Sequence, residues 1–238
     1  GFEMQNITYT YPGQASPSVD RVSLSVPAKT TVAFVGPSGS GKSTVANILA
    51  SLLVPSSGEI SVGGRPYSEI NVTQFREKVG YVTQESVVFN APLADNILLW
   101  QENTDPAKLT DVIARTGLDT IRSSQDLEQD LGDGGTALSG GERQRLSIAR
   151  ELYWDSELLI LDEATSSVDS MLEKQVDEII SGQRGTKTII VIAHRLSTVR
   201  DADIIYVFDG GRVVESGSFD DLVGSGGLFS KMAKLQSF

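Results

Sequence analysis

Apolar residues recur along the first 60 positions with two different periods, and each period predicts a different element. Val22, Leu24 and Val26 occupy every second position, which indicates a strand. Residues 31–35 form a short, largely apolar run that also predicts a strand. Helical spacing follows it at Val45, Ile48, Leu49, Leu52 and Leu53. The pattern therefore predicts a strand, a loop and a helix over 31–53.

Short strand signals lie on both sides of this segment. A turn at 11–13 separates strand-like pieces within the first 30 residues, and residues 58–62 lead into the turn Gly63-Gly64. These pieces predict an antiparallel sheet that flanks the loop. Residues 77–84 have the pattern of one more strand with a polar end.

Helical patterns dominate residues 85–154. Asp105 is placed to cap a helix that has Pro106 at its first position and stops at Gly117. Residues 130–135 are glycine-rich and irregular. The region predicts a helical insertion in an α/β core.

Strand patterns return after this insertion. Residues 158–161 form a continuous apolar run that ends in Asp162 and Glu163, the profile of a buried parallel strand. Functional groups in open α/β sheets gather at the carboxyl ends of strands. We therefore expect both acids beside the loop at 36–44. A further strand, 188–193, ends at His194, the only histidine in the sequence.

The C-terminal part adds helices and a hairpin. An apolar helix face is predicted by Leu172, Val176, Ile179 and Ile180. The strand 204–208 turns at 209–211 into 212–214, which predicts a hairpin. Residues 219–235 predict one helix with Leu228, Met232 and Leu235 on one stripe, and such a stripe more often packs in a core than against a partner.

Composition and charge exclude several classes of protein. The 238 residues, 39% hydrophobic and 21% charged, suit one large core or two small ones. No apolar stretch approaches the roughly 18 residues that span a bilayer, and the N-terminus lacks a signal-peptide pattern, so we expect this chain alone to be soluble. Cysteine is absent, which excludes disulfides and thiolate metal sites. The net charge of −11 argues against a general nucleic-acid-binding surface.

The loop after the strand 31–35 has the composition of a phosphate-binding loop. It reads Gly36-Pro37-Ser38-Gly39-Ser40-Gly41-Lys42-Ser43-Thr44. Glycines let the backbone turn tightly, so that successive N–H groups converge on phosphate oxygens at a helix N-terminus. Lys42 can then reach the β and γ phosphates, and the Ser43 hydroxyl can ligate Mg²⁺. The alternative, a flexible glycine turn, would not require the flanking strand and helix.

A second motif narrows the family. Leu138-Ser139-Gly140-Gly141-Glu142 lies shortly before the acidic strand, and together with the phosphate loop it resembles the ATP-binding cassette (ABC) ATPases, whose signature is Leu-Ser-Gly-Gly-Gln in most members. The alternative is a capping box, since Glu142 follows Ser139 by three residues. Both readings are compatible, because a serine cap and two glycines leave amides open to an anion. In the family this loop faces the ATP of a second subunit.

The resemblance implies a fold class and a domain organisation. It implies a P-loop NTPase (RecA-like) α/β core with a flanking antiparallel β-subdomain and an inserted α-helical subdomain. On this expectation the chain is one ABC ATPase domain, with its core in 1–84 and 155–238 and the helical signature subdomain in 85–154.

The resemblance also assigns roles around the nucleotide. Tyr11 is similar to the aromatic residue that stacks on adenine, although a tyrosine in a turn more often serves packing. Gln84 is similar to the glutamine that contacts Mg²⁺ or the attacking water, whereas it is otherwise a polar strand end. Asp162 resembles the acid that holds Mg²⁺, usually through water, and Glu163 resembles the base that polarises the attacking water. A solvated acidic strand end is the alternative for both.

Two further roles follow from the same family. Asp169 resembles the aspartate of the loop that runs between the two subunits, although it is also placed to cap the next helix. His194 resembles the switch histidine at the γ-phosphate, whereas a lone histidine at a strand end is usually structural. Several convergent polar groups define a site better than one does.

Details of the insertion are similar to the exporter branch of the family. Residues 128–135 resemble its Thr-x-Val-Gly-Glu-x-Gly segment, and 88–97 its Leu-Phe-Ser…Glu-Asn-Ile stretch. The departures are Asp133 for Glu, Asn90 for Ser and Glu142 for Gln. The last places a negative charge near a phosphate site, which is tolerable if Glu142 points back to cap its helix.

The resemblance implies a Mg²⁺-dependent ATPase that powers an exporter. ATP would join two such domains head to tail, as a homodimer or heterodimer, beside a transmembrane domain that is fused or separate. The chain would work at the cytoplasmic face of a plasma or inner membrane, as an excised domain or a separate subunit. A soluble cassette ATPase acting on DNA or ribosomes is disfavoured by the charge and the lack of a coiled-coil insertion. A regulator with little hydrolysis is disfavoured by Glu163 and His194.

Overall fold

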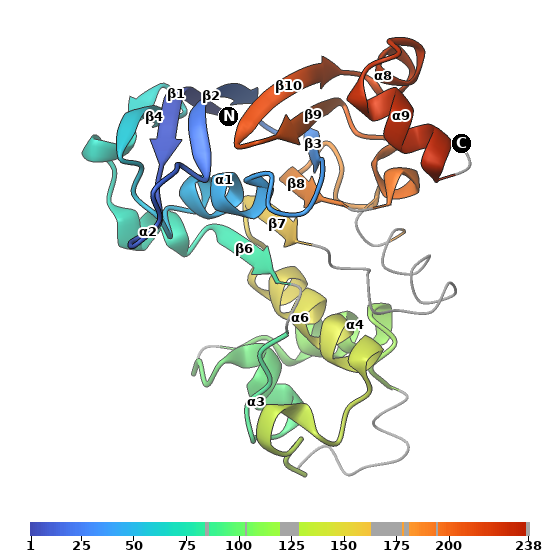
Figure 1. Ribbon diagram of the computed structural model, residues 1–238. Helices are drawn as coiled ribbons and strands as arrows, with labels where there is room; N and C mark the ends of the chain where they lie inside the picture. Colours follow the sequence, from blue (N-terminus) through green and yellow to red (C-terminus); the bar gives the residue numbers. More distant parts are fainter. Residues whose placement is uncertain are drawn as a thin grey trace. The chain divides into compact units, whose positions relative to one another are not determined.

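The computed structural model describes residues 1–83, 86–102, 104–119, 129–162, 178, 181–193 and 195–236. They form two compact units (Figure 1). Unit 1 consists of Gly1–Val79, Glu157–Asp162 and Arg184–Phe238, and unit 2 consists of Gly80–Ser156 and Glu163–Gln183. No helix among the described residues has the length and apolar content that crossing a membrane requires.

Unit 1 contains the predicted antiparallel sheet, which has four strands in the order β2-β1-β4-β5. Its strands are β1 (Phe2–Tyr9), β2 (Val19–Val26), β4 (Ser57–Val62) and β5 (Arg65–Pro66). The predicted turn between β4 and β5 is confirmed: Gly63 and Gly64 have φ angles of 57° and 79°, the left-handed region that a tight hairpin requires.

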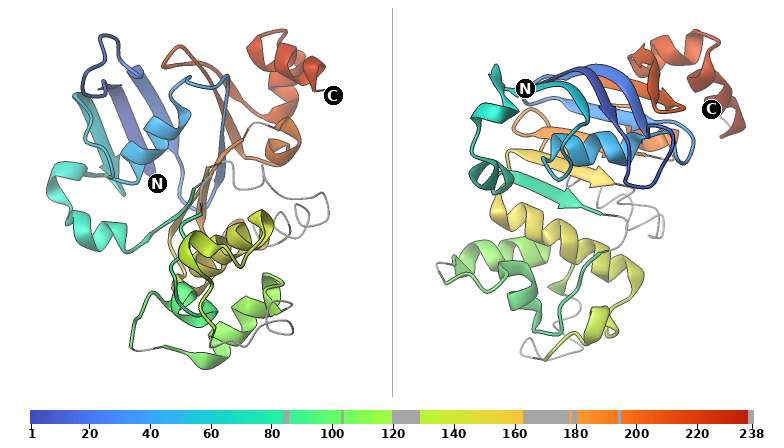
Figure 2. Two further views of the ribbon diagram at one scale, coloured as in Figure 1. Left: turned by 60° about the horizontal axis from the view of Figure 1, so that its bottom comes forward. Right: turned by 60° about the vertical axis from the view of Figure 1, so that its left-hand side comes forward.

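The second sheet of unit 1 is mainly parallel, with strands in the order β10-β9-β3-β8-β7. They are β3 (Thr31–Val35), β7 (Leu158–Asp162), β8 (Thr188–Ile192), β9 (Ile204–Asp209) and β10 (Arg212–Gly217). All five residues of β3 are buried, because the strand pairs in parallel with both β8 and β9. The two views of Figure 2 show α1 (Lys42–Leu49) beside this sheet.

Two predicted boundaries in the first 84 residues are wrong. The helix predicted to reach Leu53 ends at Leu49, because Ser51 has a left-handed φ of 59° and its carbonyl accepts hydrogen bonds from the Arg76 guanidinium. The strand predicted over 77–84 is β6 (Val79–Val82), since Glu77 still caps α2 (Val72–Arg76). A single 3₁₀ turn, η1 (Tyr67–Glu69), precedes α2.

The C-terminal segment forms two helices rather than the single predicted one. They are α8 (Phe219–Gly224) and α9 (Leu228–Leu235), and η3 (Leu196–Val199) is a 3₁₀ turn upstream. The Glu215 carboxylate accepts hydrogen bonds from the amides of Leu228 and Phe229, which gives α9 a new N-terminus. The predicted stripe is partly wrong: Leu228 and Met232 pack against buried residues, but Leu235 is 86% exposed.

After β6, the described regular elements of unit 2 are helical, as predicted. Its helices are α3 (Leu93–Leu98), α4 (Pro106–Arg115) and α6 (Gly140–Trp154), with the 3₁₀ turn η2 (Asp133–Gly135). Both α3 and α4 pack against α6. The predicted cap is confirmed, since Asp105 Oδ1 accepts the amide hydrogens of Ala107 and Lys108 at 2.9 and 3.2 Å. The helix predicted around 172–180 lies outside the described residues, except for residue 178.

A buried arginine connects α6 to α3 and to the segment before it. The Arg150 guanidinium donates hydrogen bonds to the carbonyl oxygens of Asn96 (2.6 Å) and Val87 (2.5 Å) and to Asn96 Oδ1 (2.9 Å). The Asn96 amide in turn donates to the carbonyl oxygens of Phe89 and Ala91. Burial lowers the pKa of the Arg150 guanidinium, because desolvation disfavours its charge.

Candidate functional site

The loop between β3 and α1 depends on glycine at particular positions. Gly36, Gly39 and Gly41 have φ angles of 145°, 76° and 101°, which side-chain-bearing residues rarely adopt. A Cβ at Gly36 would lie 2.1 Å from the Phe208 carbonyl oxygen, and one at Gly41 would lie 2.6 Å from that of Ser18. Gly39 has no neighbour within 4 Å of such a Cβ. The loop is therefore pressed against other backbone at both ends and open in the middle.

Lys42 lies inside the loop that precedes it. Its side chain is 5% exposed, and Nζ donates hydrogen bonds to the carbonyl oxygens of Gly36 (2.9 Å) and Pro37 (2.8 Å). Ser40 Oγ lies 3.4 Å from the same nitrogen. The ammonium is thus held at the centre of the turn that the glycines make.

The start of α1 suits an anion. No side chain caps its N-terminus and no acidic residue lies in its first turn, so its amide hydrogens remain available and its dipole is not opposed. The loop residues 37–39 and Ser43 are exposed. Open amides, an adjacent ammonium and an exposed hydroxyl fit a nucleoside triphosphate with its metal ion.

The structure places Tyr11 against this loop. The Tyr11 hydroxyl lies 3.2 Å from Thr44 Oγ1, and its ring makes an edge contact with Tyr9 at a centroid distance of 4.9 Å. Thr44 is buried while Tyr11 is only partly buried. Contact of the Tyr11 ring with adenine stays a prediction.

Asp162 lies at the same edge of the sheet as the loop. It ends β7 and pairs with Ile192 of β8, which also pairs with Phe34, two residues before Gly36. Two strand spacings separate Asp162 from β3, which is about 10 Å between backbones. A carboxylate there and the Ser43 hydroxyl are the oxygen ligands that Mg²⁺ prefers. Four predicted site residues, Gln84, Glu163, Asp169 and His194, lie outside the described residues.

The predicted signature begins α6 in unit 2, and the capping box is present. Ser139 Oγ accepts the Glu142 amide hydrogen at 3.3 Å, while Glu142 Oε2 accepts from the Ser139 amide at 2.7 Å and from its hydroxyl at 2.9 Å. Glu142 therefore points back onto its own helix start, and Arg145 lies 4.0 Å from its other oxygen. Ser139 is exposed and Gly140 half-buried, whereas Leu138 and Gly141 are buried.

Sequence reasoning missed the segments that support the phosphate loop. The Gly211 amide donates to the Ser40 carbonyl at 3.2 Å, and the Asp20 amide donates to the Gly211 carbonyl at 2.8 Å. The turn at 209–211 was predicted as a hairpin only. Its two consecutive glycines were the available signal, because a Cβ at Gly211 would lie 2.9 Å from the Ser18 carbonyl oxygen.

A glycine loop between a buried strand and a helix, with its lysine in the turn and an acidic residue at the end of another strand of the same sheet, defines a P-loop nucleoside triphosphatase. A family model described as ABC transporter matches residues 19–166, and the chain belongs to this family. The family match and the loop make it an ATP-binding domain of the ATPase class, as predicted.

Named relatives and a solved structure agree with this assignment. The chain is 41% identical over 98% of its length to a beta-(1→2)glucan export ATP-binding/permease protein of Bradyrhizobium diazoefficiens, and 39% identical over 97% to an ATP-dependent lipid A-core flippase of Cupriavidus metallidurans. It covers 39% and 40% of those proteins. It is also similar to a bacterial Atm1-family ABC exporter with ATP bound (TM-score 0.94, 33% identity, all of this chain and 42% of the other). The chain thus spans about two fifths of these relatives.

Proposed function

We propose that the chain is the motor domain of an ABC exporter, which binds and hydrolyses ATP to drive a substrate across a membrane. The relatives support this proposal, because they are named as an export protein, a flippase and an exporter. The observation that carries it is the exposed start of α6, where the capping box turns Glu142 back onto its own helix and leaves Ser139 and the half-buried Gly140 accessible. Such a surface is suited to the phosphates of ATP bound by a second copy.

The loop residues have one electrostatic task in this proposal. Phosphoryl transfer to water passes through a loose transition state, so the protein contributes positioning and charge neutralisation. Lys42 and the amides of 39–44 hold the β and γ phosphates. Ser43, Gln84 and Asp162, the last through water, would hold Mg²⁺, which would supply further positive charge at the phosphates.

The remaining roles act on the attacking water and on the dimer. Glu163 accepts the proton of the water as it attacks, and His194 contacts the γ-phosphate. Asp169 lies in the loop between the two copies. Residues 138–142 close over the nucleotide of the opposite copy, so that ATP joins two domains head to tail and hydrolysis separates them.

The proposed partners are a second copy or a homologous domain and the transmembrane domain of an exporter. One relative is named an ATP-binding/permease protein, which combines the two functions in one chain. The domain would then lie at the cytoplasmic face of a membrane.

The base assignment is tested by Glu163→Gln. Without the carboxylate the water is not activated, but ATP still binds, so we expect turnover to be lost while an ATP-dependent dimer accumulates in gel filtration. Lys42→Ala is the matched control, because it removes phosphate binding and should give neither turnover nor dimer. A Glu163→Gln domain that hydrolyses ATP at the parent rate would refute the assignment.

The head-to-tail site is tested by mixing two inactive chains. Lys42→Ala damages the loop and Ser139→Arg blocks the start of α6. A mixed dimer has one composite site with neither change, so mixing should restore about a quarter of the parent rate if the two sites act independently in a two-fold dimer. A mixture as inactive as its components would show that both motifs act within one chain.

A further inference from the structure

Three segments that are distant in the sequence contact one another through their backbones at the phosphate loop. They are the start of β2, the second half of the loop, and the turn between β9 and β10. The Gly211 amide donates to Ser40, the Asp20 amide donates to Gly211, and the position of a Cβ at Gly41 lies 2.6 Å from the Ser18 carbonyl oxygen. Unit 1 contains all three segments.

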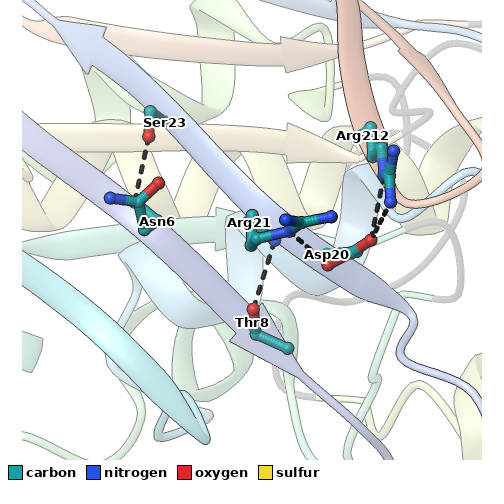
Figure 3. Close-up of polar contacts among 6 residues, drawn as sticks. All are labelled: Asn6, Thr8, Asp20, Arg21, Ser23 and Arg212. Carbon is teal, nitrogen blue, oxygen red and sulfur yellow. Dashed lines mark hydrogen bonds and ion pairs between the residues drawn. The ribbon is translucent and has the colours of Figure 1, made fainter.

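A side-chain ion pair between Asp20 and Arg212 adds a further contact between two of these segments (Figure 3). Arg212 Nε and one terminal nitrogen both donate to Asp20 Oδ2, at 2.9 and 2.5 Å. The Asp20 side chain is 22% exposed and the Arg212 side chain 56%. The pair joins β2 to the first residue of β10, directly after Gly211, which accepts the hydrogen bond from the Asp20 amide. It therefore fixes the turn at 209–211 from the side of β2.

The turn at 209–211 needs this support because it extends beyond the end of β3, the strand that pairs with β9. β9 pairs with β3 as far as Val207, opposite Val35, and β3 ends there. Beyond that point the turn contacts the phosphate loop through the hydrogen bond from the Gly211 amide to the Ser40 carbonyl oxygen. Its position is set by Ser40 on one side and by Asp20 on the other.

We propose that Asp20 and Arg212 are positioning residues for ATP binding, and that their ion pair holds the glycine turn against Ser40 and Gly41 so that the loop keeps its phosphate-binding shape. This inference rests on the proposed binding of ATP at residues 36–44. Neither side chain touches the nucleotide, and both act through the backbone of Gly211.

An exposed ion pair that only adds stability is the competing explanation. Most such pairs contribute little, and their effect is screened by salt. The two sheets also have a second connection, since the Tyr206 hydroxyl exchanges hydrogen bonds with the amide and carbonyl of Ser25. Loss of the ion pair therefore leaves the sheets joined, and the fold should survive its removal. The experiment must separate a change in the loop from a change in stability.

Arg212→Gln tests the proposal, with Arg21→Gln as the matched control. Arg21 also forms an ion pair with Asp20, at 3.3 Å, but through the other carboxylate oxygen, Oδ1 (Figure 3). We expect Arg212→Gln to raise the Kd and KM for ATP about fourfold while kcat at saturation stays within about twofold, the range of a well-oriented surface ion pair. Arg21→Gln should leave all three values near those of the parent, and Arg212→Lys should recover most of the affinity.

Hydrogen exchange of the nucleotide-free protein gives a readout that does not need activity. Amides of residues 40–44 should exchange faster in Arg212→Gln than in the parent or in Arg21→Gln. If Arg212→Gln lowers Tm but changes neither exchange in the loop nor the Kd for ATP, the pair is only stabilising and the inference is wrong. A parent that fails to bind ATP would instead refute the proposed function, while the exchange comparison would still decide whether the pair holds the loop.

Discussion

The phosphate loop and the start of α6 are held in different ways. The loop has no side-chain cap, and its shape depends on glycines that touch the backbone of other segments. The start of α6 is held by its own side chains, Ser139 and Glu142, three residues apart. The loop depends on contacts between distant segments, and a side chain at Gly36 or Gly41 would collide with their backbone. The start of α6 depends on two nearby side chains, which can be substituted one at a time.

The largest expected effect is that of Gly36→Ala, which tests the tertiary arrangement. The new methyl group would collide with the Phe208 carbonyl oxygen at 2.1 Å, and the φ of 145° suits only glycine. We expect the free energy of unfolding to fall by about 3 kcal/mol or more, and ATP binding to be lost. Urea unfolding and nucleotide titration measure the two effects.

Gly39→Ala is the control for this change. Its φ of 76° is also strained for alanine, but the added methyl group meets nothing within 4 Å. We expect a cost of about 1 kcal/mol from the backbone alone. Equal losses at Gly36 and Gly39 would mean that the contact with Phe208 has no role.

Ser139→Ala should have an intermediate effect, because it removes only a local cap. The Glu142 amide loses its acceptor, and Glu142 keeps the Ser139 backbone amide as a partner. We expect the free energy of unfolding to fall by about 1 kcal/mol, the usual cost of losing an N-cap. If the free energy of unfolding fell as much as in Gly36→Ala, the local cap of α6 would matter as much as the tertiary contacts of the phosphate loop.

The smallest expected effect concerns the pH dependence of the Asp20 carboxyl. Hydrogen bonding to Arg212 holds the pKa of Asp20 below its ordinary value. A folded pKa below the unfolded one stabilises the fold above the unfolded pKa, and this contribution is lost as the pH falls through the folded pKa, in the range below about pH 4. In Arg212→Gln, a carboxyl titration by NMR should give a pKa closer to the ordinary value. An unchanged pKa would mean that the ion pair does not form in solution.

The sequence predicted most reliably those features that are encoded within a few consecutive residues. The phosphate loop, the hairpin at Gly63-Gly64 and the cap at Asp105 each combine a required backbone shape with the residues that produce it. The fold class followed from the order of these elements and from the resemblance of two motifs to one family. The capping role of Glu142 was also accessible, because its partner lies three residues away.

The features that were missed depend on residues far along the chain. α1 ends early because Arg76 binds the Ser51 carbonyl, and α9 begins anew because Glu215 reaches its amides from β10. Asp20 and Arg212 are 192 residues apart, so no local pattern connects them. Such endings and contacts appear only when the strands have been placed beside one another.

Arg150 gives unit 2 a mechanical property. Its guanidinium binds the carbonyl oxygens of Val87 and Asn96, on either side of Phe89, whose ring lies 5.5 Å from the same guanidinium and 5.2 Å from Trp100. Phe89 is 40% exposed and Trp100 56%. A force on these two rings therefore reaches α6 through Arg150.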